Sequence, residues 1–211
     1  MAVITISRLF GAGGWTLASR LSTRLGYGCI NENMIKEAAS KLKVSSAQIQ
    51  YFEKEGGSML MRFIDKLVNT RFIDRHLSDS YGFVNEKNYV DVIGKIILEI
   101  HDKGNMIIIG RGGQFILKDF PDTVHLLLVQ NMESRIAFMM ENYNLTRPDA
   151  EKSIRQRDLI RRRFLGFFTD VEHIDDPSHY DLVLNMDRVG MDMAENLVVN
   201  LVEKKEAQPV G

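Results

Sequence analysis

Short apolar runs alternate along this chain with segments in which apolar residues recur at helical spacing. The strand-like runs are VITI at 3–6, MIII at 106–109, VHLLLV at 124–129 and DLVLN at 181–185. Near-continuous apolar runs of this length are typical of strands buried on both faces of a sheet. Helical spacing is found for Val92, Ile96, Ile97 and Ile100, for Ile136, Met139 and Met140, and for Ala194, Leu197, Val198, Leu201 and Val202. The alternation predicts an α/β fold in which helices cover both faces of a parallel sheet.

Residues 45–90 interrupt this alternation of strands and helices. Apolar residues at helical spacing in this segment predict a largely helical insertion, and they are Leu60, Phe63, Ile64, Leu67 and Val68. Such an insertion can close over a substrate, or it can pack into a local core or a homodimer contact, and both interpretations stay open. We expect residues 1–206 to form one domain and residues 207–211 to be a disordered tail.

The first apolar run leads directly into a glycine-dense turn, FGAGGWT at residues 10–16. The glycines free the backbone for a tight turn, and we expect a helix to begin at Thr16. Backbone N–H groups and the helix dipole would then converge on a phosphate group. The residues expected to hold nucleotide phosphates are Gly11, Ala12, Gly13, Gly14, Trp15 and Thr16.

This turn differs from the usual phosphate-binding loop, because Gly14 occupies the place of the lysine. Arg8 lies at the start of the turn, and its guanidinium could replace part of the missing charge with a two-pronged contact. The Thr16 hydroxyl could bind a phosphate oxygen or a Mg²⁺ ion. The alternative for Thr16 is an ordinary residue of the first helical turn.

A second glycine-rich turn, GRGG at 110–113, follows the MIII run. Ligands bind outside the carboxyl ends of strands in open α/β sheets, so we expect Arg111 to lie at the cleft. A phosphate group is the expected partner of Arg111, and backbone carbonyl groups are the alternative. The flanking glycines favour the ligand, because side chains are absent where it would approach.

A third feature is the arginine-rich run RQRDLIRRRF at 155–164. On a helix, Arg157 and Arg161 stand four residues apart on one face, and Asp158 is expected to pair with Arg161 or Arg162. A solvated helix face and an RNA-binding patch are the alternatives. The run contains no lysine, and arginine is preferred where transferring phosphate oxygens are held by planar, paired donors.

Composition narrows the functional classes further. The chain has 211 residues, 45% of them hydrophobic and 26% charged, with a formal net charge of −1. This balance disfavours general binding to nucleic acid or to anionic membranes. The sequence contains no apolar stretch of about 18 residues, so we expect neither a membrane-spanning helix nor a secretory leader, and Cys29 is its only cysteine. These features predict a cytoplasmic protein, and the five histidines lack the spacing of a metal site.

The three features, taken in order, resemble the divergent cytidylate kinase-like family of nucleoside monophosphate kinases. The opening ITISRLFGAGGWTLA is similar to the family's strand, phosphate loop and helix, and RQRDLIRRRF is similar to its arginine-rich lid. LGYGCINENMI resembles the family's acceptor segment, with Asn31 where an aspartate is usual. IIIGRGGQFIL, FPDTVHLLL and DDPSHYDLVLNMDRVG resemble later core strands.

The resemblance implies a P-loop NTPase fold with a five-stranded parallel sheet and a lid at 153–172. It also implies transfer of the γ-phosphoryl group of ATP, with Mg²⁺, to a nucleoside monophosphate or a similar small phosphorylated acceptor. In this interpretation Arg8 and the lid residues Arg157, Arg161 and Arg162 are catalytic, and Arg111 and Asn31 bind the acceptor. A nucleotide-binding protein without useful catalysis is the second hypothesis, and an RNA-binding protein is the third.

Overall fold

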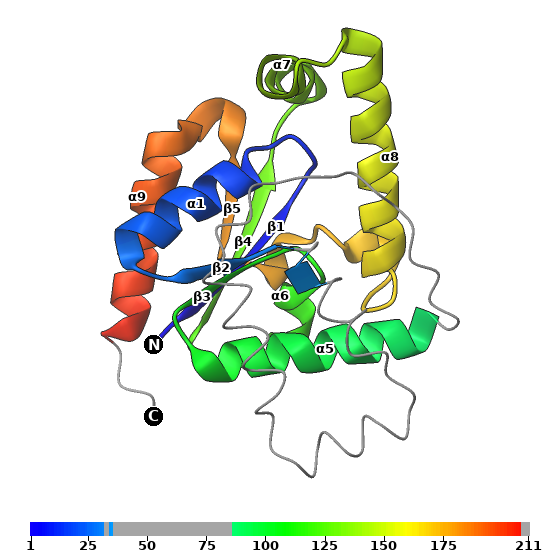
Figure 1. Ribbon diagram of the computed structural model, residues 1–211. Helices are drawn as coiled ribbons and strands as arrows, with labels where there is room; N and C mark the ends of the chain where they lie inside the picture. Colours follow the sequence, from blue (N-terminus) through cyan, green and yellow to red (C-terminus); the bar gives the residue numbers. More distant parts are fainter. Residues whose placement is uncertain (32–33, 36–85, 208–211) are drawn as a thin grey trace.

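Five parallel strands form one sheet in the order β2-β3-β1-β4-β5 in the computed structural model, which describes residues 1–31, 34–35 and 86–207 (Figure 1). The strands are β1 Val3–Arg8, β2 Gly28–Ile30, β3 Met106–Ile109, β4 Thr123–Val129 and β5 Leu182–Asn185. Four of them coincide with the predicted apolar runs. The short edge strand β2, whose sequence is GCI, was not predicted from the apolar pattern.

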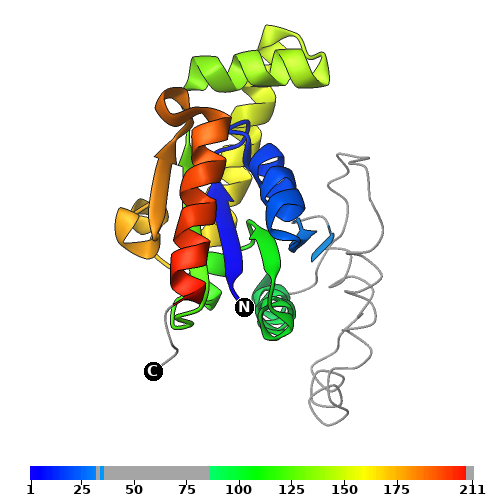
Figure 2. The ribbon, with the colours of Figure 1, turned by 90° about the vertical axis from the view of Figure 1, so that its left-hand side faces the viewer.

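Helices cover both faces of this sheet, as the alternation predicts (Figure 2). They are α1 Gly14–Leu25, α5 Glu86–Lys103, α6 Gly113–Ile116, α7 Met132–Tyr143, α8 Arg147–Leu165 and α9 Met186–Glu206, with short 3₁₀ turns η1 Val171–His173 and η2 Pro177–His179. Helix α1 begins at Gly14, two residues before the predicted start. No helix in the described part of the chain is long and apolar enough to cross a membrane.

The alternation of side chains along β1 divides the core between the two faces. Ile4 and Ile6 are buried in a cluster with residues of α1 and α9, whereas Val3 is buried with residues of α5 and β3 on the other face. Burying one such aliphatic side chain contributes about 1.5–3 kcal/mol to stability. Each face of the central strand therefore anchors a separate helical layer.

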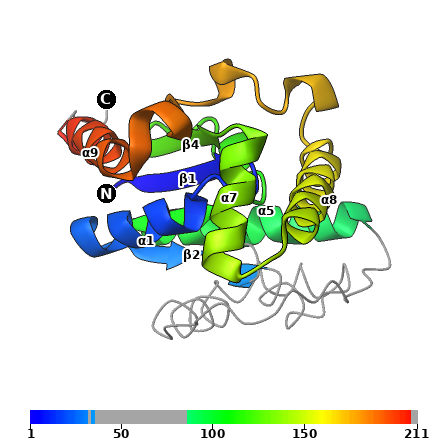
Figure 3. The same cartoon turned by 90° about the horizontal axis from the view of Figure 1, so that it is seen from above.

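Strand register brings the two glycine-rich turns to the same edge of the sheet. Ile6 of β1 pairs with Ile109 of β3, and the N–H of Gly110 donates to the Ile6 carbonyl at 3.0 Å. The segments after β1 and β3 then leave the sheet at its carboxyl edge, where α7 and α8 lie when the molecule is seen from above (Figure 3). The predicted insertion at 45–90 lies outside the described residues up to residue 85, and so does the tail from residue 208.

Candidate active site

The turn after β1 has the backbone geometry of an anion cradle. Gly11 and Gly13 have φ of 88° and 78°, and Gly13 is the N-cap of α1 without a side-chain capping bond. The first amides of an α-helix lack partners within the helix, and the first turn of α1 carries no acidic residue. The N–H of Ala12 donates to the Leu9 carbonyl at 3.1 Å, so this amide is used within the turn.

Trp15 and Thr16 lie in the first turn of α1 and are exposed, Trp15 to 41%. The indole therefore does not fill the turn in which phosphates are expected. The exposed Thr16 side chain stands at the helix N-terminus, where a phosphate oxygen or a phosphate-bound cation can approach it.

Arg8 and Gly14 are matched sterically. A Cβ added at Gly14 would lie 3.0 Å from Cγ and 3.3 Å from Cδ of Arg8, closer than ordinary van der Waals contact. The stem of Arg8 therefore fills the space in which a side chain at position 14 would begin. A lysine at position 14 and an arginine at position 8 cannot both adopt this arrangement without displacement.

Four arginines from three segments of the chain line one cavity at the carboxyl edge of the sheet. They are Arg8 after β1, Arg111 after β3, and Arg157 and Arg161 on α8, and Ser7 and Asp158 also line the cavity. The cavity has a volume of about 50 Å³. A small anion or a few waters would fit that volume, whereas ligand pockets typically reach about 300–1,000 Å³.

Arg111 is held beneath α8. It has a positive φ of 58° and is only 8% exposed, between Gly110 and Gly112, which also have positive φ. Its guanidinium carbon lies 4.9 Å from the ring centre of Phe164 on α8, within the range of a cation–π contact. The residue therefore reaches the cleft, as expected from its position after β3.

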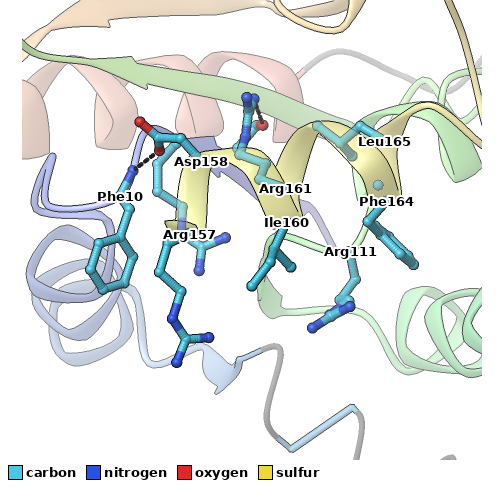
Figure 4. Close-up of a pocket in the computed structure, with 12 residues that line it drawn as sticks. Phe10, Arg111, Arg157, Asp158, Ile160, Arg161, Phe164 and Leu165 are labelled. Atoms are coloured by element: carbon cyan, nitrogen blue, oxygen red, sulfur yellow. Dashed lines mark hydrogen bonds between the residues drawn. The ribbon is translucent and has the colours of Figure 1, made fainter. Parts of the chain in front are cut away.

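The arginines of α8 point in two directions (Figure 4). The guanidinium groups of Arg157 and Arg111 extend to the same side of the helix, and that of Arg157 lies 5.8 Å from the ring centre of Phe10. Arg161 turns to the other side, where it donates to Ser7 Oγ at 2.9 Å and pairs with Asp175. Arg162 is exposed and does not line the cavity.

Asp158 does not pair with Arg161 or Arg162, so that prediction was wrong. One carboxylate oxygen accepts the N–H of Phe10 at 3.0 Å, and the other accepts Nη1 of Arg135 at 2.6 Å. The partner lies on α7, 23 positions away in the sequence, and no local spacing could identify it.

A half-buried tyrosine supports the segment that follows α8. The Tyr180 hydroxyl donates to the Ile174 carbonyl at 2.9 Å and accepts Nε2 of Gln114 at 3.2 Å. Burial raises the pKa of Tyr180 above its ordinary value. Ile174 directly precedes Asp175, the partner of Arg161, which places this network behind the arginine. None of these residues was predicted.

Asn31 has a structural role in the described part of the chain. Its side-chain oxygen accepts the N–H of Met34 at 3.0 Å, and its carbonyl accepts the N–H of Ile35 at 3.1 Å. It does not line the cavity that contains the arginines.

The residues at the turn fit a phosphate group better than a protein-held metal. No group of three or more histidine, cysteine or acidic side chains able to hold a metal occurs among the described residues. Asp158, which lines the cavity, is already bonded to Arg135 and to the Phe10 amide. A Mg²⁺ ion here would be held mainly by phosphate oxygens and water, with Thr16 as the candidate protein ligand.

The sequence matches the model of the cytidylate kinase-like family over residues 3–188. The chain belongs to the cytidylate kinase-like family. This membership confirms the resemblance and supports a phosphotransferase of the P-loop kinase kind. No curated protein matches the chain.

Solved structures agree on the fold of this family member. An uncharacterized protein from Eubacterium ventriosum matches with a TM-score of 0.69 and 16% identity, covering 96% of this chain and 99% of the other. Shikimate kinase from Bacteroides thetaiotaomicron matches with a TM-score of 0.51 and 11% identity, covering 96% of this chain and 98% of the other. Shikimate kinase from Acinetobacter baumannii, in complex with shikimate, matches with a TM-score of 0.50 and 14% identity, covering 99% of this chain and 96% of the other. The P-loop NTPase fold is therefore confirmed.

Proposed function

We propose that this chain is an ATP-dependent phosphotransferase that acts on a nucleoside monophosphate or a related small phosphorylated acceptor. The observation that carries the proposal is that Arg8, Arg111 and Arg157 line one cavity beside the glycine turn, to which α8 also contributes Arg161 with its guanidinium turned toward Ser7 and Asp175. Family membership supports the reaction class. The proposed partners are small molecules, and neither nucleic acid nor a membrane is among them.

In the proposed reaction, different residues hold the donor phosphates, the acceptor phosphate and the group in transfer. ATP with Mg²⁺ supplies the transferable group, and the protein mainly positions the reactants and stabilises charge. The amides of the glycine turn, with Arg8, would hold the donor phosphates, and Arg111 the acceptor phosphate. Arg157 lies between these two regions on α8, where it can contact the group in transfer. An anionic phosphate acceptor needs no general base, which fits a cavity lined by arginines.

The small volume of the cavity limits what it can enclose. A whole nucleotide exceeds about 50 Å³, so either only its phosphates would enter the cavity or α8 would move outward to admit it. Arg161 is bonded to Asp175 and Ser7 in the arrangement described here. Transfer to a bound phosphate would require exchange of the Asp175 carboxylate for phosphate oxygens.

A nucleotide-binding protein without turnover is the second candidate function. Two observations favour it: Gly14 stands where the usual loop has its lysine, and Arg161 is held by a carboxylate. The two candidates differ in turnover, whereas both require nucleotide binding at the glycine turn.

The test is ADP formation with ATP, Mg²⁺ and a panel of nucleoside monophosphates. Arg8→Ala should lower turnover at least tenfold, because the turn then loses its substitute charge. Arg155→Ala is the matched control, since Arg155 lies exposed on α8 and bonds Glu151 outside the cavity. The double variant Arg8→Gly with Gly14→Lys should recover more activity than Gly14→Lys alone, because it removes the steric conflict.

Binding is read separately from the fluorescence of Trp15, the only tryptophan in the chain. Nucleotide-dependent fluorescence and thermal stabilisation without ADP formation would favour the binding protein over the enzyme. If ATP changes neither the Trp15 fluorescence nor the thermal stability, both candidate functions are refuted. An Arg8→Ala variant as active as wild type would refute the role of Arg8.

A further inference from the structure

We infer that Asp158 and Arg135 are positioning residues that fix the arginine helix α8 to the glycine turn. The inference rests on the proposed function for its kinetic consequence. The structural connection itself can be tested without turnover.

The connection holds both polar backbone groups of one residue in the turn. The N–H of Phe10 donates to Oδ1 of Asp158 at 3.0 Å, and the Phe10 carbonyl accepts Nη1 of Arg135 at 3.2 Å. The same Nη1 donates to Oδ2 of Asp158 at 2.6 Å (Figure 4 shows the Phe10 bond). Three segments, the turn, α7 and α8, therefore meet in one closed set of hydrogen bonds.

Burial makes this set resistant to rearrangement. The side chain of Arg135 is 7% exposed and that of Asp158 is 21% exposed. A Cβ added at Gly11 would lie 3.2 Å from Cβ of Arg135, so the arginine also packs against the turn directly. Removing either charge would leave the other one largely buried without its partner, which is strongly unfavourable.

The position of the set explains how it can act on catalysis. Asp158 directly follows Arg157, and Arg161 stands one helical turn later, so fixing Asp158 fixes the direction of both arginines. The Phe10 amide is committed to Asp158, and the amides offered to phosphate therefore begin at Gly11. Because Gly14 provides no charge, the positive groups near the phosphates come from side chains whose position relative to the turn must be set.

This arrangement predicts a specific kinetic pattern. The amides of the turn should still bind ATP when Asp158 is changed, so KM for ATP should change by less than about threefold. The arginines would be misplaced, and a shift of about 1 Å can cost about 10²-fold in rate. We therefore expect kcat to fall about 10–100-fold in Asp158→Ala. Asp158→Asn keeps an acceptor for the Phe10 amide and should lose less.

The control variant is Glu151→Gln, which breaks the exposed pair with Arg155 on the same helix. It should leave kcat and KM as in the wild type. Hydrogen exchange at the Phe10 amide is the second readout. Exchange should accelerate at least tenfold in Asp158→Ala, by less in Asp158→Asn, and remain unchanged in Glu151→Gln. Circular dichroism establishes whether each variant is folded. If Asp158→Ala does not fold, Asp158→Asn takes its place in both measurements.

The outcomes separate this inference from the proposed function. If the wild type transfers no phosphate to any acceptor, the proposed function fails, and exchange at Phe10 alone decides whether the connection exists. Unchanged Phe10 exchange in the folded Asp158 variants would overturn the inference in either case. In an active protein, a raised KM with unchanged kcat would also overturn it, because Asp158 would then act in ATP binding.

Discussion

The two glycine-rich turns of this protein follow neighbouring strands and have similar sequences, yet they present different groups to the cleft. The turn after β1 leads into α1, a helix of 12 residues with Trp15 exposed in its first turn. The turn after β3 leads into α6, which has only four residues. A long helix with an open N-terminus presents amides and a dipole, whereas a one-turn helix has little dipole to offer.

The second turn is also covered by an aromatic ring, whereas the glycines of the first turn are contacted by the side chains of Arg135, Met191 and Arg8. The N-cap of α6 is Gly112, and a Cβ added there would lie 2.7 Å from the ring of Phe168. Gly113 is buried against Thr5 of β1. The backbone of this turn is therefore packed into the protein, and the group that reaches the cavity is the side chain of Arg111. Similar glycine patterns serve here to start a long helix after one turn and to aim a side chain in the other.

The largest expected effect comes from removing that side chain while relieving its backbone. Arg111→Gly should reduce turnover about 10²–10³-fold, the usual loss for one well-placed electrostatic donor. The free energy of unfolding should change little. Glycine adopts the positive φ of 58° without strain, and this relief of backbone strain offsets the loss of the contact between Arg111 and Phe164. Steady-state kinetics and thermal melting measure the two effects. Full activity in Arg111→Gly would show that the second turn does not serve the acceptor.

A smaller effect should follow from filling the covered turn. Gly112→Ala would combine a positive φ of 72° with the contact to Phe168, and we expect a loss of about 2–3 kcal/mol in the free energy of unfolding. Gly26→Ala is the control, because its φ of 70° is similar and nothing lies within 4 Å of the added Cβ. It should lose only the backbone part, about 1–2 kcal/mol. Equal losses in denaturant unfolding would mean that Phe168 does not seal the turn.

These differences mark the limit of what the sequence could predict. The pattern of apolar runs predicted the sheet, because β1, β3 and β4 are buried on both faces and read as continuous apolar segments. It missed β2, since a three-residue edge strand has no such run. The position of Arg111 at the cleft was predictable from the rule that ligands bind outside the carboxyl ends of parallel strands, whereas the approach of Arg157 on α8 was expected only from the family resemblance.

The side-chain partners within the site were not predictable. Asp158 stood out as the only acidic residue in an arginine-rich run, and helical spacing suggested local pairing with Arg161 or Arg162. The observed partner, Arg135, comes from α7, and the packing of two helices decides that contact. The Arg161 bonds to Ser7 and Asp175 likewise depend on tertiary structure. Spacing predicts neighbours on one element, whereas contacts between elements depend on the fold.

The smallest expected effect is a pH dependence confined to the support of the second turn. Thr5, which packs against Gly113, is joined to Nδ1 of His125 by a hydrogen bond of 2.7 Å. Burial lowers the pKa of His125, and the nearby Asp181 carboxylate only partly offsets this effect. The unfolded chain therefore takes up a proton at higher pH than the folded chain does.

The free energy of unfolding should accordingly decline as the pH falls below about 6.5, the ordinary pKa of histidine. The decline should continue until the pH reaches the lowered pKa of His125 in the folded protein. Denaturant unfolding at pH 7.5 and 5.5 measures this decline. The decline should be smaller in His125→Gln, which cannot titrate, and should be retained in His173→Gln, where the side chain is exposed. The first turn has no such histidine among its described contacts, so ATP-dependent Trp15 fluorescence should change less than stability over this range. An identical pH slope in the wild type and His125→Gln would remove His125 from the support of the second turn and leave packing against Thr5 as its basis.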